Sequence, residues 1–185
     1  MLEPAAAPSP SLARPDEDVL VTDSARSLEE AIAVLGELPA DEYSAESPVG
    51  STVGAHFRHV LDHYLCLLDG LDSGLIHYEG RRRDPIIETD REAALALASG
   101  VTARLRALPA SVLHRPVRVR CMGGELAEIH HGDHSSTAPR ELHFVLLHAV
   151  HHYSFIAVEL RRRGYSPDPD FGVAPATRAW RRSRA

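Results

Sequence analysis

Histidines at helical spacing are the residues of this sequence best suited to chemistry. His148 and His152 lie four positions apart, so on a helix they project from one face, about 40° from each other. Two imidazoles one turn apart can bind the same metal ion. His56, His59 and His63 form a second group, at spacings of three and four residues. The two groups together predict a divalent metal site between two helices.

Such a site needs a third imidazole from the other helix. Zinc or a similar divalent ion would then have three nitrogen ligands and a fourth position for water or a substrate. The candidates are His59 and His63. On a helical wheel His63 lies nearer than His59 to the apolar stripe of its helix, so spacing alone does not choose between them. His56 and His63 are also candidates for acid–base groups beside the metal.

Other polar residues share the faces of these histidines. Glu141, His148, His152 and Glu159 fall within about 40° of one another on an otherwise apolar helix. Burial of this line without partners would be costly, so a metal ion, or carboxylates that hold the imidazoles, is expected to satisfy it. Cys66 shares the face of the earlier histidines and is a candidate fourth ligand or redox thiol, although a helical cysteine is more often a small core residue.

Four amphipathic segments are expected to form the helices that position the histidines. Apolar residues recur at three- and four-residue spacing, and Pro39, Pro109 and Gly164 end three of the segments. The expected helices span about residues 23–38, 52–71, 90–108 and 137–163. Alternating residues in 115–131 predict a short β-hairpin between the third and fourth helices. The fold class is therefore all-α, a four-helix bundle with a short β-hairpin.

The two ends of the chain differ from this middle part in composition. Residues 1–18 are rich in proline, alanine and acidic residues, and are expected to be a disordered lead. Residues 19–177 are expected to form the bundle domain. Residues 178–185 contain four arginines and are expected to be a basic, frayed tail.

Composition excludes several classes of function. The net charge of −6 argues against nucleic-acid binding, and the absence of an apolar run of about 18 residues argues against a membrane span. No basic segment followed by an apolar run marks a secretory signal, so the protein is expected to be cytoplasmic. All 20 basic residues are arginine, which excludes a Schiff-base lysine. The arginines at 81–83 are typical of a solvated charge run, with contact to an anionic substrate as the alternative.

The histidine motifs resemble those of a known family. Residues 52–62, Thr-Val-Gly-Ala-His-Phe-Arg-His-Val-Leu-Asp, are similar to the second-helix motif of DinB-like proteins, in which a metal-binding histidine precedes an apolar pair and an acidic residue. The segment from His148 to His152 is similar to the His-x-x-x-His motif on that family's last bundle helix. The resemblance spans about residues 20–175. It implies His59, His148 and His152 as the metal ligands.

The resemblance also implies a range of functions. DinB-like proteins are four-helix bundles that usually hold one divalent ion, and many are dimers, which implies a homodimer here. The ion is expected to be zinc, with nickel or iron as alternatives. Related domains include thiol-dependent S-transferases and a mycothiol-dependent maleylpyruvate isomerase. Sulfoxide synthases of the ergothioneine type carry a glutamate two residues after the second histidine, and Ser154 stands at that position here, which argues against their iron chemistry.

Two functions from different classes follow. The first is a metal-dependent enzyme that activates water or a small thiol, such as mycothiol or bacillithiol, against a small-molecule substrate, as a hydrolase or an S-transferase. His63 would be its general base. The second is a non-catalytic metal-binding or stress-associated bundle protein. Its fourth coordination position would be closed by Cys66, Glu159 or His63.

Overall fold

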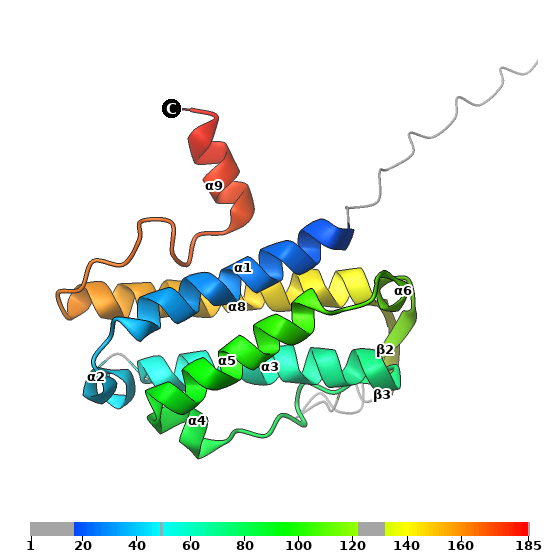
Figure 1. Cartoon of the computed structure of the whole chain (residues 1–185), viewed down its shortest axis with the longest axis horizontal. Helices are drawn as coiled ribbons and strands as arrows, with labels where there is room; N and C mark the ends of the chain where they lie inside the picture. The colour runs from blue at the N-terminus through cyan, green and yellow to red at the C-terminus, as the bar shows by residue number, and fades with distance from the viewer. Residues whose placement is uncertain (1–16, 49, 122–131, 185) are drawn as a thin grey trace, which may run out of the picture.

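The computed structural model describes residues 17–48, 50–121 and 132–184. Four long helices form a bundle in this part of the chain: α1 (Glu17–Gly36), α3 (Val53–Ser73), α5 (Arg91–Arg106) and α8 (Ala138–Arg162). Helix α1 packs against α5 and α8, and α3 packs against the same two helices, so the four surround a common apolar core (Figure 1). The predicted all-α four-helix bundle is confirmed.

The helices do not simply alternate in direction. Helices α1 and α8 run one way along the bundle, and α3 and α5 run the other way (Figure 1). Because α3 and α5 are parallel neighbours, residues 74–90 must return the chain from the end of α3 to the end where α3 began. This crossover contains β1 (Leu75–Ile76) and α4 (Pro85–Thr89). The shorter link between α1 and α3 contains α2 (Ala40–Ser44), and α6 (Ala110–Leu113) follows α5.

A small sheet closes one end of the bundle, beside the end of α3 and the start of α8 (Figure 1). Strands β2 (Pro116–Cys121) and β3 (Gly132–Thr137) are antiparallel, with Val117 opposite Ser136, and β1 pairs with β2 in parallel. The predicted short β-hairpin between the third and fourth long helices is confirmed; its second strand is Gly132–Thr137, which leads directly into α8. The intervening residues 122–131, with His130 and His131, lie outside the described residues.

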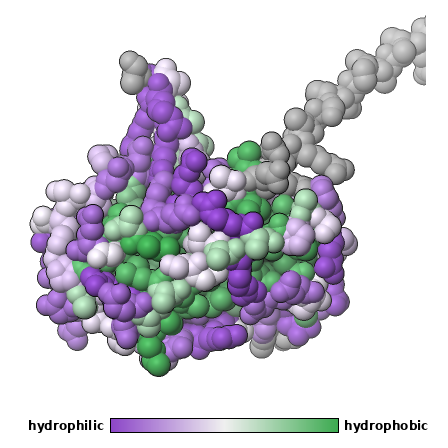
Figure 2. Space-filling view, viewed as in Figure 1, coloured by the Kyte–Doolittle hydropathy of each residue, from purple (hydrophilic) through white to green (hydrophobic). Residues whose placement is uncertain are grey.

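Near both ends of the chain the structure contains helices in segments where the sequence predicted none. Helix α1 begins at Glu17, inside the segment predicted to be disordered; residues 1–16 lie outside the described part. The tail predicted to be frayed contributes to helix α9 (Pro175–Arg182), which projects from the bundle and is covered by hydrophilic side chains (Figures 1 and 2). Arg178 ties this helix to α1 through a 2.7 Å ion pair with Glu30. The described helices include none that is long and apolar enough to cross a membrane.

The start of α3 is fixed against the crossover by a close backbone approach. Thr52 caps the helix, accepting a 3.0 Å hydrogen bond at Oγ1 from the Ala55 N–H. Two residues before His56, a Cβ on Gly54 would overlap the Glu88 carbonyl oxygen and lie 2.7 Å from Cε1 of Tyr43. The glycine therefore lets α4 pack directly on the part of α3 that carries the first histidines.

We expect Gly54→Ala to destabilise the protein by about 1–3 kcal/mol, because backbone and a buried ring must move to make room for the methyl group. Gly100→Ala is the matched control. Gly100 lies inside α5, where an added methyl group would have no atom within 4 Å, so the substitution should stabilise by roughly 0.5–1 kcal/mol through helix propensity. Urea unfolding measures both changes. Stabilisation by both substitutions would contradict the close approach of α4.

Candidate metal centre

The two predicted groups of histidines meet between α3 and α8. Helices α3 and α8 are antiparallel neighbours. A residue near the start of α3 therefore faces one farther along α8, and a later residue of α3 faces an earlier one of α8. The His59 Nε2 atom lies 2.9 Å from Nε2 of His148, and the His56 Nδ1 atom lies 3.0 Å from Nδ1 of His152. The structure thus brings together all the histidines that the sequence proposed as ligands.

Two different sets of three imidazoles are compatible with this arrangement. The His63 ring centroid lies 4.4 Å from that of His59 and 4.3 Å from that of His148. The His152 centroid lies 4.4 Å and 4.6 Å from the same two rings. One ligand atom each from His59, His63 and His148 lie within 4.8 Å of one another. His59 and His148 therefore belong to both sets, and the third ligand is His63 or His152.

Burial and mutual repulsion keep these imidazoles neutral. Burial, with the help of neighbouring histidines, lowers the pKa of His59 and of His152 to about 3 and that of His148 to about 4. Burial also lowers the pKa values of His56 and His63. A neutral imidazole has the nitrogen lone pair that a metal ion needs. The cluster is half-buried except for His63, of which only 6% is exposed.

The orientation of His63 is set by its backbone and by a tyrosine from the crossover. Its Nδ1 lies 2.7 Å from the His59 carbonyl oxygen, which can only accept a hydrogen bond, so Nδ1 carries the proton and Nε2 is left as the acceptor. The Tyr78 ring stacks on His63 at 5.5 Å, and its hydroxyl donates a 2.9 Å hydrogen bond to buried Glu141 of α8. Tyr78 thereby links the crossover to both helices of the site.

This donor set fits a divalent metal ion. Two imidazole nitrogens on one tetrahedral zinc ion would be about 3.3 Å apart, given Zn–N bonds of 2.0–2.1 Å. The 2.9 Å between the Nε2 atoms of His59 and His148 differs from that by a few tenths of an ångström. The hydrogen bond from His63 to a backbone carbonyl is also typical of histidines at metal sites, where the second nitrogen is held by an acceptor.

Glu159 and Cys66, the other candidates for the fourth coordination position, do not join the histidines. Glu159 accepts hydrogen bonds from Arg162 and Arg163, which hold the pKa of its carboxyl at about 2. Cys66 is half-buried, and burial raises the pKa of its thiol to about 11, so it is protonated at neutral pH. Among the described residues, the ligand atoms that lie within 4.8 Å of one another belong to His59, His63 and His148, and neither Glu159 nor Cys66 is among them. The polar line along α8 is thus satisfied at both ends by tyrosine and arginine partners.

Exposed aromatic rings border the cluster, and sequence reasoning did not identify them. Phe144 stacks on His148 with ring centroids 5.8 Å apart, and Phe155 stacks on His56 at 5.3 Å. Both phenylalanines are among the exposed large apolar residues, and both lie on the face of α8 that carries the histidines. Their spacing of three or four residues from His148 and His152 was the signal that could have found them. It was hidden because α8 has apolar residues on nearly every side.

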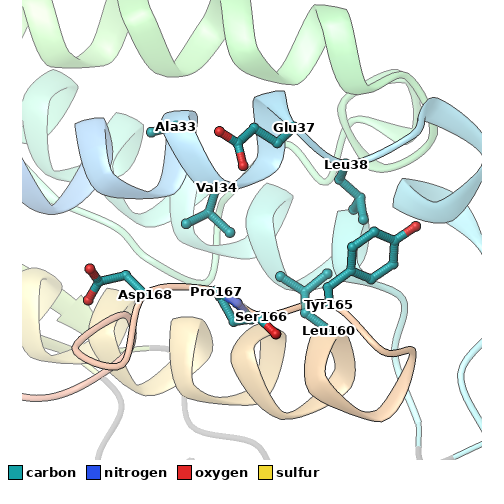
Figure 3. A pocket seen from close by; sticks show the side chains of 9 residues that line it. All are labelled: Ala33, Val34, Glu37, Leu38, Leu160, Tyr165, Ser166, Pro167 and Asp168. Carbon is teal, nitrogen blue, oxygen red and sulfur yellow. The ribbon is translucent and has the colours of Figure 1, made fainter.

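A hollow elsewhere on the chain lacks these imidazoles. It lies between α1 and the segment after α8, and Figure 3 shows its lining. Its apolar lining includes Leu38, Leu160 and Tyr165, and Glu37 and Asp168 are its acidic residues. Two carboxylates without an imidazole or a thiol make a poorer site for a transition metal than the histidine cluster. The histidine cluster is therefore the candidate functional site.

Comparisons with known proteins agree with this fold. Residues 25–156 match the family described as the DinB superfamily. A solved structure of YfiT from Bacillus subtilis, described as a probable metal-dependent hydrolase with an unusual four-helix bundle topology, is similar in fold with a TM-score of 0.62. The two sequences are 15% identical, and the similarity covers 87% of this chain and 95% of that one. No curated protein matches the chain in sequence.

Proposed function

Because the chain belongs to the DinB superfamily, we propose that it is a metal-dependent enzyme of the hydrolase type that acts on a small molecule. The observation that carries this proposal is the meeting of the His59, His148 and His152 rings between α3 and α8, with centroids 4.4–5.0 Å apart. The description of YfiT as a probable metal-dependent hydrolase supports it. Following the family motif, His59, His148 and His152 would hold the ion. Zinc is our first choice because three imidazoles with one open position are typical of zinc enzymes, and nickel and iron, which imidazole also binds, are the alternatives.

Each part of the site has a role in this reaction. A divalent ion, when bound, supplies the Lewis-acid chemistry that makes water or a thiol a better nucleophile at neutral pH. His63, whose Nδ1–H is held by the His59 carbonyl, offers Nε2 to take the proton of the attacking water. Tyr78 keeps the His63 ring in place by stacking on it. Phe144 and Phe155 border the imidazoles and would limit access of bulk water to a bound substrate.

Chelation followed by zinc addition tests the proposal. We expect hydrolysis of 4-nitrophenyl acetate, used as a chromogenic probe, to fall to the blank rate when the metal is removed and to return when zinc is restored. His63→Gln at saturating zinc should lower the rate about 10²- to 10⁴-fold, because the proton acceptor is lost. His143→Gln, on an exposed position of α8, is the control and should leave the rate unchanged. A rate that is indifferent to chelation would contradict metal-dependent hydrolysis.

The nucleophile is water in this proposal, and a small thiol is the alternative. The same preparation should therefore be assayed for conjugation of a thiol such as cysteine to an electrophilic fluorophore such as monochlorobimane. Metal-dependent conjugation without ester hydrolysis would reassign the protein to S-transfer.

A non-catalytic site is favoured by one specific observation. The cluster offers more than three imidazoles, because His56 and His152 lie beside the set formed by His59, His63 and His148. Four imidazoles would close the coordination sphere and make the ion structural. Absorption spectra of the cobalt-substituted protein discriminate. A spectrum that changes on addition of azide indicates an exchangeable position and supports the enzyme, whereas an indifferent spectrum supports the structural role.

A further inference from the structure

The three consecutive arginines of the crossover differ in their surroundings. Arg82 and Arg83 are exposed; Arg82 forms a 4.0 Å ion pair with Asp69, and Arg83 donates hydrogen bonds to the carbonyl oxygens of Glu79 and Arg81. Arg81 is half-buried and, among the described residues, makes no ion pair. The sequence predicted that all three arginines form a solvated charge run. In the structure this describes Arg82 and Arg83, whereas Arg81 is partly buried.

Arg81 is held beside the His63 end of the histidine cluster. Its Nη1 donates a 3.1 Å hydrogen bond to the carbonyl oxygen of Tyr78. The Tyr78 ring in turn stacks on His63 and contacts the ring of Phe144, with centroids 5.3 Å apart. The positive charge of the Arg81 guanidinium is close enough to repel a proton on the imidazoles, and it contributes to the lowered pKa values of His59, His63 and His148.

Part of the Arg81 guanidinium has no partner. Its Nε atom is buried and makes no hydrogen bond within the described residues. Two of the nearby acidic side chains are already occupied, because Asp62 pairs with Arg58 at 3.0 Å and Asp69 pairs with Arg104 at 2.9 Å. A guanidinium presents Nε–H and one Nη2–H in parallel, the pair of donors that a carboxylate or phosphate accepts with two oxygens. With Nη1 fixed on Tyr78, this edge remains for a ligand.

We propose that Arg81 binds an anionic group, a carboxylate or a phosphate, of the substrate that reacts at the histidine cluster. This inference rests on the proposed function and gives its substrate a chemical class: a small anion. The anionic group would contact Arg81 beside Tyr78, and the reacting group would lie toward His59 and His148. Arg81 thus determines specificity by fixing one end of the substrate, and it takes no part in proton transfer.

Titration calorimetry with succinate and with inorganic phosphate tests the assignment on the metal-loaded protein and on a chelated sample. Arg81→Gln is expected to weaken binding of the preferred anion about 10- to 100-fold in both samples, as loss of a charge-assisted contact does. Arg82→Gln, the matched control, should change the affinity less than about twofold, because that side chain is 77% exposed. Tighter binding of succinate would identify a carboxylate substrate, and tighter binding of phosphate a phosphorylated one.

Two further measurements keep the proposal open to refutation. Arg81→Gln should leave the zinc content unchanged, because Arg81 is not a metal ligand, and should lower the melting temperature by only a few degrees, because it loses one hydrogen bond, to the Tyr78 carbonyl. Arg81→Lys, which keeps the charge but loses the paired donors, should bind the anion with intermediate affinity and serves if the glutamine variant fails to fold. Equal losses in Arg81→Gln and Arg82→Gln, or no binding of either anion by the wild type, would overturn the proposal. If ester hydrolysis does not depend on the metal but Arg81→Gln still weakens anion binding, only the proposed hydrolase activity is refuted.

Discussion

Protein with His148→Ala is expected to be purified with almost none of the divalent ion that the wild type carries at about one per chain. His148 belongs to both sets of three imidazoles that the structure allows, so the expectation does not depend on which set binds. Its Nε2 lies 2.9 Å from Nε2 of His59, at the centre of the cluster. Removal of one of three nitrogen ligands should lower the affinity by orders of magnitude, and elemental analysis after desalting measures the loss.

His143→Ala is the matched control for this experiment. It lies on the same helix as His148 but is exposed, so it should retain the metal of the wild type. The wild type should also unfold at a lower temperature after chelation, because an ion that binds only the folded state stabilises it. His148→Ala should show no such difference. Equal metal content in the two variants would remove His148 from the site.

The fold could be predicted from local patterns, and its crossover could not. Apolar periodicity placed the ends of the four long helices within about two residues of those observed, because each helix buries an apolar stripe; the exception is the start of α1, at Glu17 instead of about residue 23. The path of residues 74–90 is not indicated by any such periodicity in the sequence. It is set by long-range contacts, such as the hydrogen bond from the Tyr43 hydroxyl to the Ile87 carbonyl and the approach of Glu88 to Gly54. For that reason local patterns did not reveal that the crossover brings Tyr78 and Arg81 to the cluster.

The histidine site was predictable because its spacing repeats on two helices. The wheel placed His63 nearer than His59 to the apolar stripe of its helix, and His63 is the most buried of the cluster. The partners of the flanking carboxylates were not predictable. Glu141 was expected to hold an imidazole, but its partners are Tyr78, Ser136 and Arg140, which come from the crossover, β3 and the first turn of α8. A helical wheel gives the face of a residue but not what another segment places against it.

The choice between His63 and His152 as the third ligand leads to the second large effect. The family motif selects His59, His148 and His152, whereas the atoms that lie within 4.8 Å of one another belong to His59, His63 and His148. We retain the motif, because the resemblance places the ligand of α3 at His59; the Nδ1–H bond of His63 leaves its Nε2 free either to bind the ion or to accept a proton. His59→Ala should then lower the metal affinity by orders of magnitude. His63→Ala should lower it only about 10- to 100-fold, as loss of a residue that supports a ligand does.

Competitive titration of each variant against a chromogenic chelator ranks the histidines, and His152→Ala decides between the two sets. If the motif is right, His152→Ala loses as much affinity as His59→Ala, and His63→Ala stays closer to the wild type while losing hydrolytic activity at saturating zinc. If instead His63→Ala falls to the level of His59→Ala and His152→Ala keeps the ion, the ligands are His59, His63 and His148. If the Nε2 of His63 binds the ion, its lone pair is no longer free to accept a proton. The Nδ1 of His63 already carries a proton, so neither ring nitrogen could act as a base. The role of His63 as general base would then be refuted together with the motif assignment, and His56 or His152 would be the remaining imidazoles able to serve.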